Sequence, residues 1–278
     1  MNRHKKKFKV ACIQLNTQQS ILRNLKHTLK YIHEACSAGA EFILTPEITN
    51  TISLKKKDLL KITFYEKDDP FLNEISFLAK DRSVWILIGS LIIKDKGNRI
   101  FNRSFLINPG GKLVCKYDKI HMFDAMISKK EFYKESSVFS KGSKIITAQL
   151  PWGKLGMSIC YDLRFPDLYR KLSSNGADLI SIPSAFTRPT GKAHWHTLIR
   201  ARAIENSCFI FAPAQCGKNS SYRKTYGHSL IISPWGEIIA EKKDKPGIIL
   251  ANIDMSYVEK VRKMIPSYKL KTLLKNNN

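Results

Sequence analysis

Short apolar runs alternate with amphipathic helical patterns along almost the whole chain, and this alternation limits the fold more than any other feature. Many of the runs are apolar on both faces, as is typical of strands that are buried inside a protein. We expect strands at residues 8–15, 41–44, 84–93, 104–107, 156–160, 179–182, 208–212, 229–232 and 248–253.

Helical patterns fill several of the gaps between these runs. In residues 19–38 the apolar side chains Ile21, Leu25, Leu29 and Ile32 recur three or four positions apart, and Gly39 suits the end of a helix. Similar patterns occupy residues 70–82, 165–175 and 192–206. Strands that alternate with helices along the chain predict the α/β fold class.

No linker interrupts this order, so residues 8–267 are predicted to form one domain with flexible basic ends at residues 1–7 and 268–278. No apolar stretch approaches the roughly 20 residues that a transmembrane helix needs, and the basic start lacks the apolar core of a signal peptide. The six cysteines show no metal or redox spacing. We expect a cytoplasmic protein without a disulfide framework.

The chain is strongly basic, with a formal net charge of +24. Such a charge is typical of proteins that bind nucleic acids or anionic surfaces. The lysines are scattered, however, and no basic stripe interleaved with aromatic residues accompanies them. We interpret the charge as a solvated surface, with attraction of acidic substrates as a second interpretation, and expect neither a membrane nor a nucleic acid as partner.

Two turn sequences resemble each other across the chain. Asn108-Pro-Gly-Gly111 and Ser233-Pro-Trp-Gly236 both lie between predicted strands, and proline at the second position with glycine at the fourth suits a type I turn. Two similar hairpins are consistent with a quasi-symmetric pair of sheets.

Residues 156–166 are the most informative for chemistry. A strand is predicted to end at Cys160 and a helix to start near Pro166, since proline is favoured in a first helical turn. A cysteine at such a turn can expose its sulfur beside backbone N–H groups that face a developing oxyanion. Spacing alone does not separate this nucleophile from a buried structural cysteine.

Two further segments bear on that choice. Thr45-Pro46-Glu47 follows a predicted strand, and Lys119 lies in a turn-like run at residues 116–124. Together with the Cys160 segment they resemble the nitrilase, or carbon–nitrogen hydrolase, superfamily over residues 8–266. The resemblance implies an α-β-β-α four-layer sandwich and a catalytic set of Glu47, Lys119 and Cys160. It also implies a second active-site glutamate, which is Glu135 here, with Glu131 as an alternative.

The chemistry implied by the resemblance is amide hydrolysis through a thioester. Glu47 would take the thiol proton as Cys160 attacks the amide carbonyl. Lys119 and the backbone N–H of Tyr161 would hold the tetrahedral oxyanion. Glu47 would then protonate the departing ammonia and activate the water that releases the carboxylic acid. No cofactor is expected.

The C-terminal motifs are similar to the deaminated glutathione amidase and ω-amidase branch, at residues 184–196, 200–206, 212–217, 225–229 and 233–236. That branch implies an amide substrate with a carboxylate, such as deaminated glutathione or a dicarboxylic acid monoamide. We expect Arg164 to pair with this carboxylate, and Thr187 and Thr190 to contact the substrate from a loop. The alternative for Arg164 is a structural ion pair with Asp162 or Asp167.

Other functions remain open at this point. An N-carbamoyl amino acid hydrolase would use the same three catalytic groups on a ureido carbonyl. A basic binding protein on an inactive hydrolase scaffold has no need of Glu47, Lys119 and Cys160 together. Members of the superfamily usually pair through helices, so we expect a homodimer or a larger homo-oligomer.

His194 and His196 alternate, and His196 stands where the family often has glutamate. On a strand the two side chains would share one face and could bind a metal. They precede a helical pattern, however, and no cysteine or carboxylate lies nearby at ligand spacing. We therefore expect packing or capping roles for them, and no metal site. The five cysteines other than Cys160 are expected to be structural.

Overall fold

A computed structural model describes residues 6–52, 55–129, 131–221 and 223–269. Strands β1 (Lys7–Gln14), β2 (Phe42–Leu44), β3 (Trp85–Asp95), β4 (Arg99–Ile107), β5 (Leu113–Asp118) and β16 (Gly247–Asp254) form one six-stranded sheet, in the order β16-β1-β2-β3-β4-β5. The second six-stranded sheet contains β8 (Thr147–Leu150), β9 (Gly153–Met157), β10 (Leu179–Ser181), β11 (Phe209–Ala212), β14 (Ser229–Ile232) and β15 (Ile238–Lys242).

The two sheets repeat one pairing pattern. Read as β16-β1-β2-β3-β4-β5 and as β8-β9-β10-β11-β14-β15, neighbouring strands are in turn antiparallel, parallel, parallel, antiparallel and antiparallel in both sheets. The similar turns at residues 108–111 and 233–236 join equivalent strand pairs, β4 to β5 and β14 to β15. The hairpin resemblance seen in the sequence therefore reflects a duplicated topology.

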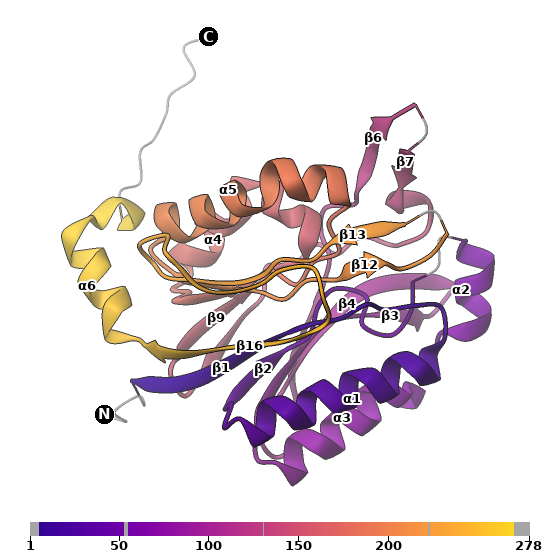
Figure 1. Cartoon of the computed structure of the whole chain (residues 1–278), viewed down its shortest axis with the longest axis horizontal. Coiled ribbons are helices and arrows are strands. Elements are labelled where there is room, and N and C mark those ends of the chain that lie inside the picture. The colour runs from indigo at the N-terminus through magenta and orange to yellow at the C-terminus, as the bar shows by residue number, and fades with distance from the viewer. Residues whose placement is uncertain (1–5, 53–54, 130, 222, 270–278) are drawn as a thin grey trace.

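Helices cover the outer face of each sheet, which completes the four layers (Figure 1). Helices α1 (Ile21–Ser37) and α3 (Pro70–Asp81) pack on the first sheet, and α4 (Pro166–Ser174) and α5 (Arg188–Asn206) pack on the second. Two shorter helices, α2 (Lys56–Ile62) and α6 (Ser256–Met264), lie at opposite ends of the molecule. The fold is the α-β-β-α sandwich that the sequence predicts.

Alternation along the strands explains why the layers hold together. In β1, Val10 and Cys12 belong to the core between the two sheets, whereas Ala11 and Ile13 pack with α1 and α3. Successive side chains of a strand point to opposite faces, so a strand that is apolar at every position can bury both. Each fully buried aliphatic side chain contributes about 1.5–3 kcal/mol, and that burial joins the four layers.

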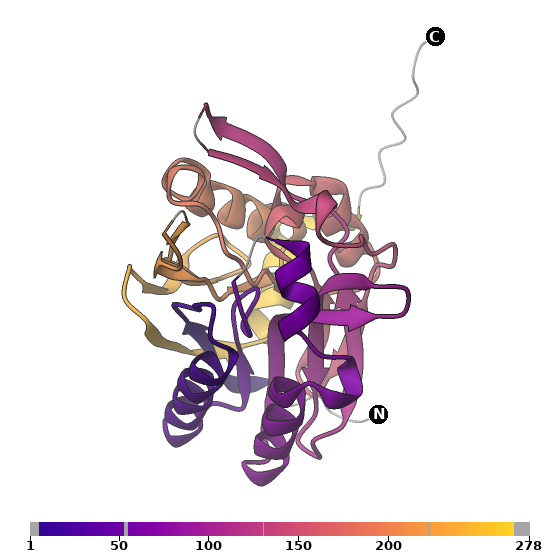
Figure 2. The same cartoon turned by 90° about the vertical axis from the view of Figure 1, so that its right-hand side faces the viewer.

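Two small hairpins add to the sheets: β6 (Asp124–Ser128) with β7 (Glu131–Lys134), and β12 (Cys216–Lys218) with β13 (Lys224–Tyr226). The β6–β7 hairpin projects beyond the body of the molecule in both views (Figure 2). Neither hairpin was predicted, and nor were α2 and α6, because these segments are short and rich in polar residues.

Some predicted boundaries were wrong near the site. The strand expected to end at Cys160 ends at Met157, and Cys160 instead begins a 3-10 turn. The helix expected at residues 192–206 begins at Arg188, so Thr190 lies in its first turn rather than in a loop.

The basic ends assigned to residues 1–7 and 268–278 fall mostly outside the described residues. Lys7 lies in β1, and η4 (Pro266–Lys269) is a 3-10 turn. Within the described part of the chain, no helix is both long and apolar enough to span a membrane.

Candidate active site

Glu47 lies three residues after β2, in a turn with an uncommon backbone conformation. The next residue, Ile48, has a left-handed φ of 48°, which costs a β-branched residue free energy and persists only where its surroundings hold it. The Ser90 hydroxyl does so by accepting the Ile48 N–H at 2.7 Å. The Glu47 side chain is only 4% exposed, and its Oε1 accepts from the Asn102 amide at 2.9 Å. The turn thus presents a buried, oriented carboxylate.

The turn after β2 meets the turn after β10 at Gly89 of β3. A Cβ atom on Gly89 would lie 1.9 Å from the Thr45 carbonyl oxygen and 2.5 Å from the Cβ of Pro183. No side chain fits there, so glycine lets the two turns approach. The Pro183 carbonyl in turn accepts the Cys160 N–H at 3.0 Å. This contact links the nucleophile turn to the Glu47 turn.

Lys119 directly follows β5, and its side chain is 2% exposed. Its Nζ donates to Oε1 of Glu47 at 2.8 Å and to both carboxylate oxygens of Glu135 at 2.9 Å. Glu135 begins the 3-10 turn η2 (Glu135–Ser137). The alternative, Glu131, accepts instead from the Tyr133 hydroxyl at 2.9 Å. Lys119 therefore lies between Glu47 and Glu135.

Cys160 begins the 3-10 turn η3 (Cys160–Arg164) with a φ of 48°. A cysteine held in this conformation is strained, as is common at functional sites. Its thiol is buried, and it lines the same cavity as the Glu47 carboxylate, which raises its pKa after burial does. The N–H of Tyr161 lies in the first turn of η3, where N–H groups lack partners within the helix and can face an anion.

The charges of this set follow from burial and pairing. Burial, and after it the charge of Glu47, raise the pKa of the Cys160 thiol well above its usual value. Burial alone would raise the pKa of Glu47, but the neighbouring Lys119 ammonium lowers it. Burial opposes the charge of Lys119, and the carboxylates of Glu135 and Glu47 outweigh it and raise its pKa. The resting site is a neutral thiol beside an ionised carboxylate and a protonated amine.

A cavity of about 280 Å³ opens onto these groups. Its lining includes every side chain proposed from the sequence as a site residue, namely Glu47, Lys119, Glu135, Cys160, Tyr161, Arg164, Thr187 and Thr190. The cavity is large enough for a small amide, and Cys160 lies in its wall. The arrangement can therefore support attack on a bound carbonyl by a thiol beside a general base.

Arg164 reaches the cavity without an acidic partner among the described residues. Its Nη2 lies 3.2 Å from Nδ1 of His194, and its guanidinium lies 5.5 Å from the ring centroid of Phe186. The two structural ion pairs considered from the sequence do not form. Asp162 is fully buried and bound elsewhere, and Asp167 makes no ion pair with Arg164. A guanidinium on an aromatic wall is available for a ligand anion.

Thr187 and Thr190 line the same cavity, but their hydroxyls bond to each other at 2.8 Å. Thr187 precedes α5 as its N-cap residue, and the Thr190 hydroxyl also donates to the Thr187 carbonyl at 3.4 Å. The pair therefore serves first to shape the start of α5, and less of its hydrogen-bonding capacity is free for a substrate than the sequence suggested.

A comparison with family models decides the assignment. The model of the carbon–nitrogen hydrolase family matches residues 9–263. The chain belongs to this family. It is accordingly a hydrolase that acts on carbon–nitrogen bonds other than peptide bonds.

The similarity to individual proteins is consistent with this family assignment. The chain is 37% identical to the probable hydrolase nit2 of Schizosaccharomyces pombe, with 92% of this chain and 95% of the relative covered. It is 36% identical to the deaminated glutathione amidase of Yersinia enterocolitica, with 94% and 92% covered. The crystal structure of Saccharomyces cerevisiae Nit3, a nitrilase superfamily member, superposes with a TM-score of 0.84 at 31% identity and covers 98% of this chain and 96% of Nit3.

The sequence did not single out Asp162 as a site residue of this hydrolase, although it lies two residues after the nucleophile. Its carboxylate accepts from the Tyr117 hydroxyl at 2.7 Å, from the Ile159 N–H at 2.9 Å and from the His121 N–H at 3.0 Å. These bonds join the segment before Cys160 to the segments on both sides of Lys119. Asp162 is therefore a positioning residue for both, a role that only tertiary structure shows.

Arg223 is a second cation that the sequence did not suggest. It lines the cavity, donates from Nη2 to the Ala185 carbonyl at 3.1 Å, and lies 5.8 Å from the ring centroid of Tyr133 on the β6–β7 hairpin. Its buried Nε has no hydrogen-bond partner in the described part of the chain. Arg223 also contributes to lowering the pKa of Glu47, so it lies on the general-base side of the cavity.

Proposed function

We propose that this chain is an amidase that hydrolyses linear amides bearing a carboxylate, through a thioester on Cys160. The observation that carries the proposal is the contact of a neutral buried thiol with an ionised Glu47, which Lys119 and Asn102 hold in place. A carboxylate in that position serves as a general base without needing a preformed thiolate.

The reaction begins when the substrate carbonyl enters the cavity beside Cys160. Glu47 takes the thiol proton as sulfur bonds to the carbonyl carbon, and the Lys119 ammonium and the Tyr161 N–H stabilise the oxyanion. Collapse of the tetrahedral intermediate breaks the C–N bond, and Glu47 returns the proton to the departing nitrogen. Ammonia or an amine leaves, and the acyl group stays on sulfur.

Hydrolysis of the thioester uses the same base. Glu47 takes a proton from water as the water oxygen attacks the thioester carbonyl, and Lys119 again stabilises the oxyanion. The C–S bond then breaks, the carboxylic acid leaves, and Glu47 returns the proton to sulfur. Glu135 keeps Lys119 positioned through both halves of the reaction.

The two arginines support a substrate that carries negative charge. Arg164 and Arg223 line the cavity, whereas the carboxylates in its lining, Glu47 and Glu135, are already bound to Lys119. An anionic group of the substrate would therefore meet guanidinium groups that form no ion pair with a carboxylate among the described residues. A relative named deaminated glutathione amidase supports the same class of substrate.

A panel of amides tests the proposal. Acid and ammonia release is measured on succinamate, 2-oxoglutaramate and deaminated glutathione, on propionamide as the uncharged amide, and on an N-carbamoyl amino acid, with Cys160→Ala protein as the blank. We expect the highest kcat/KM on the amides that carry a carboxylate. A preference for the carbamoyl compound would favour the N-carbamoyl hydrolase, and no turnover together with salt-dependent nucleic-acid binding would favour the binding protein.

We propose that two copies of the chain associate through the end of α5 and α6. Apolar side chains are exposed there, and η4, which follows α6, packs against α5. The exposed residues are Ile204, Trp235, Ile238, Met264 and Ile265. Sedimentation at micromolar concentration should show a dimer or larger species, and a single species of 31.8 kDa would contradict this.

We also propose a cytoplasmic location. All six cysteines, which lie in the described part of the chain, are free thiols, as is usual in a reducing compartment. Fractionation of cells that express the tagged chain would test this, and a chain found with secreted proteins would contradict it.

A further inference from the structure

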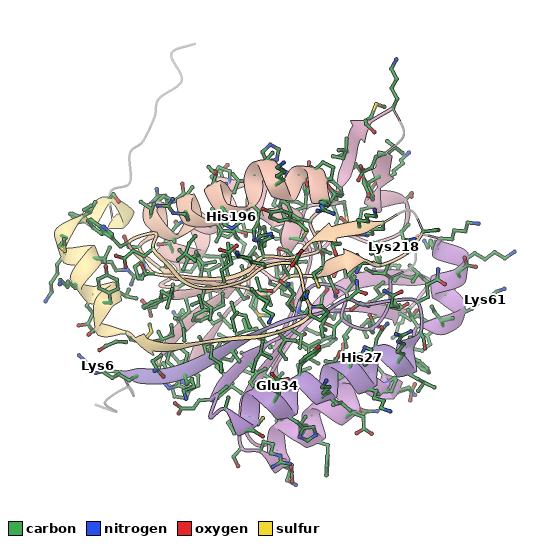
Figure 3. The ribbon with its side chains drawn as sticks, in the orientation of Figure 1. Lys6, His27, Glu34, Lys61, His196 and Lys218 are labelled. Atoms are coloured by element: carbon green, nitrogen blue, oxygen red, sulfur yellow. The ribbon has the colours of Figure 1, made fainter. Side chains whose placement is uncertain are left out.

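Three side chains outside the active-site cavity converge on one point of the surface. His196 comes from α5, His228 from the residue before β14, and Glu241 from β15. Oε1 of Glu241 lies 3.0 Å from Nε2 of His196 and 2.6 Å from Nδ1 of His228. We call these three residues the His–His–Glu cluster. Figure 3 shows His196 between α5 and the strands beneath that helix.

The cluster is held in place by its surroundings. His228 has a left-handed φ of 59°, its carbonyl accepts from the Trp195 indole at 2.7 Å, and its N–H donates to the Lys243 carbonyl at 2.8 Å. The Tyr226 ring stacks on the His228 ring with a centroid separation of 4.2 Å. A strained residue fixed at both backbone groups and on its ring face has little freedom to move its Nδ1 atom away.

We propose that the His–His–Glu cluster binds a divalent transition-metal ion of the zinc type, with water completing a tetrahedral site. Two imidazoles and one carboxylate form a known zinc donor set, and ligands at a tetrahedral zinc lie roughly 3.3 Å apart. Two of the three ligand pairs are already near that separation, and the two imidazole nitrogens lie within 4.8 Å of each other. A small rearrangement therefore brings all three to one ion.

Access and charge are also suitable. The three side chains are 21–31% exposed, so an ion can reach them from solvent and keep a water ligand. The Glu241 carboxylate offers an oxygen that already contacts both imidazoles.

An ion at this place would connect α5 to the hairpin of β14 and β15. The first turn of α5 contributes Thr190 to the active-site cavity, and His196 lies further along the same helix. The site would fix α5 against β15 at the edge of the second sheet. We therefore assign the metal a structural role, separate from the chemistry at Cys160.

Metal titration of the full chain tests the proposal. Cys160→Ala protein, which removes the active-site thiol as a competing ligand, is treated with a chelator, dialysed and titrated with Zn²⁺ by calorimetry and with Co²⁺ by absorption spectroscopy. We expect one ion per chain, visible d–d bands of tetrahedral Co²⁺, and a rise in Tm of about 3–8 °C at a free Zn²⁺ concentration 100 times Kd.

Single substitutions identify the ligands. His196→Ala and Glu241→Gln in the same background should weaken Zn²⁺ binding at least about 100-fold, since even outer-shell changes cost 10- to 100-fold. His194→Ala is the matched control, because His194 lies on the same helix and contacts Arg164 instead; it should bind Zn²⁺ as its parent does. Absence of a site, or a site that survives both ligand substitutions in proteins that fold normally, would overturn the proposal.

Discussion

The two halves of the molecule repeat one topology but differ in what they place at equivalent positions. Three residues after β2 lies Glu47, and three residues after its counterpart β10 lies Ser184; a proline precedes each. One residue after β5 lies Lys119, and one residue after its counterpart β15 lies Lys243. Lys119 is buried between two carboxylates, whereas Lys243 is exposed.

At a third pair of equivalent positions, the proposed catalytic residue belongs to the second half. Cys160 lies three residues after β9, and Thr17 lies three residues after the equivalent strand β1. Thr17 is used in structure, since its hydroxyl accepts from the Gln215 amide at 2.7 Å. In the proposed mechanism the first half therefore supplies the base and the cation, and the second half supplies the nucleophile. The strand topology is repeated, but Glu47 and Lys119 of the first half and Cys160 of the second half line one cavity.

Loss of the thiol should have the largest effect. Cys160→Ala should lower kcat by at least about 10⁴-fold, because no other group can form the thioester. Its free energy of unfolding should change by no more than about 2 kcal/mol, since the substitution removes one small buried group. Stopped assays of acid release and urea unfolding measure the two quantities. Residual activity above about one hundredth of wild type would show that Cys160 is not the nucleophile.

Substitutions at Glu47 and at the equivalent Ser184 compare the two halves directly. Glu47→Gln should lower kcat by about 10³- to 10⁵-fold, because the amide cannot take the thiol proton. Ser184→Ala is the matched control in the other half: its hydroxyl donates only to the Ile182 carbonyl, at 3.0 Å, so about 0.5–1.5 kcal/mol of stability and little activity should be lost. Similar activity losses in both variants would contradict the proposal that the first half supplies the general base.

Substitution of Lys119 and of Lys243 should change the free energy of unfolding by different amounts. Lys119→Met leaves the buried Glu47 and Glu135 carboxylates without their common partner, so we expect a loss of about 3–5 kcal/mol of unfolding free energy. Lys243→Met, at the equivalent exposed position, should change it by less than about 0.5 kcal/mol. Urea denaturation followed by circular dichroism measures both. Equal unfolding free energies for the two variants would mean that the ion pairs of Lys119 make no net contribution to stability.

Substrate charge should be recognised by the second half. Arg164→Ala should reduce kcat/KM for carboxylated amides by about ten- to a thousandfold, as expected for loss of a buried charge-assisted contact. Propionamide should be hydrolysed almost as before. Arg170→Ala, an exposed arginine on α4, is the matched control and should leave both substrates unchanged. Equal losses on charged and neutral amides would assign Arg164 to structure.

The smallest expected effect is a change at acid pH in the stability difference between wild type and Glu47→Gln. The folded pKa of Glu47 is below its ordinary value of 4.5, so its ionised form stabilises the folded chain above about pH 4.5. This contribution is lost as the pH falls through the folded value. The stability gap between wild type and Glu47→Gln should therefore narrow below pH 4.5, as measured by urea unfolding across pH. A gap that widens with acid would contradict an ionised Glu47.

The sequence proposes Glu47, Lys119 and Cys160 as catalytic groups because short motifs around them resemble a family, and in the structure all three line one cavity. Spacing could not have shown that they meet: Glu47 and Lys119 are 72 residues apart and touch only through the fold. Local pattern also misplaced the end of β9, since residues 158–160 read as a strand although the chain turns at Cys160. Apolar periodicity does not report such a turn.

Residues that act through tertiary contacts could not be predicted from the sequence for the same reason. Asp162 acts through groups on either side of Lys119, and Arg223 reaches the cavity from an unpredicted hairpin. His196 was judged to lack a nearby carboxylate, yet Glu241, 45 residues later, bonds to it. Charged and polar residues that contact each other carry no periodic signal in the sequence. Their contacts result from the way the four layers pack, so sequence patterns do not predict them.

The pairing of β16 with β1 has a consequence for synthesis on the ribosome. Strand β1, Lys7–Gln14, receives one of its two neighbours from β16, Gly247–Asp254, which is synthesised much later. At about 5–20 residues per second, the nascent chain carries that open edge for roughly 10–50 s. An unpaired strand edge invites association with other chains. Chaperone demand during translation should accordingly depend on how quickly β16 emerges from the ribosome.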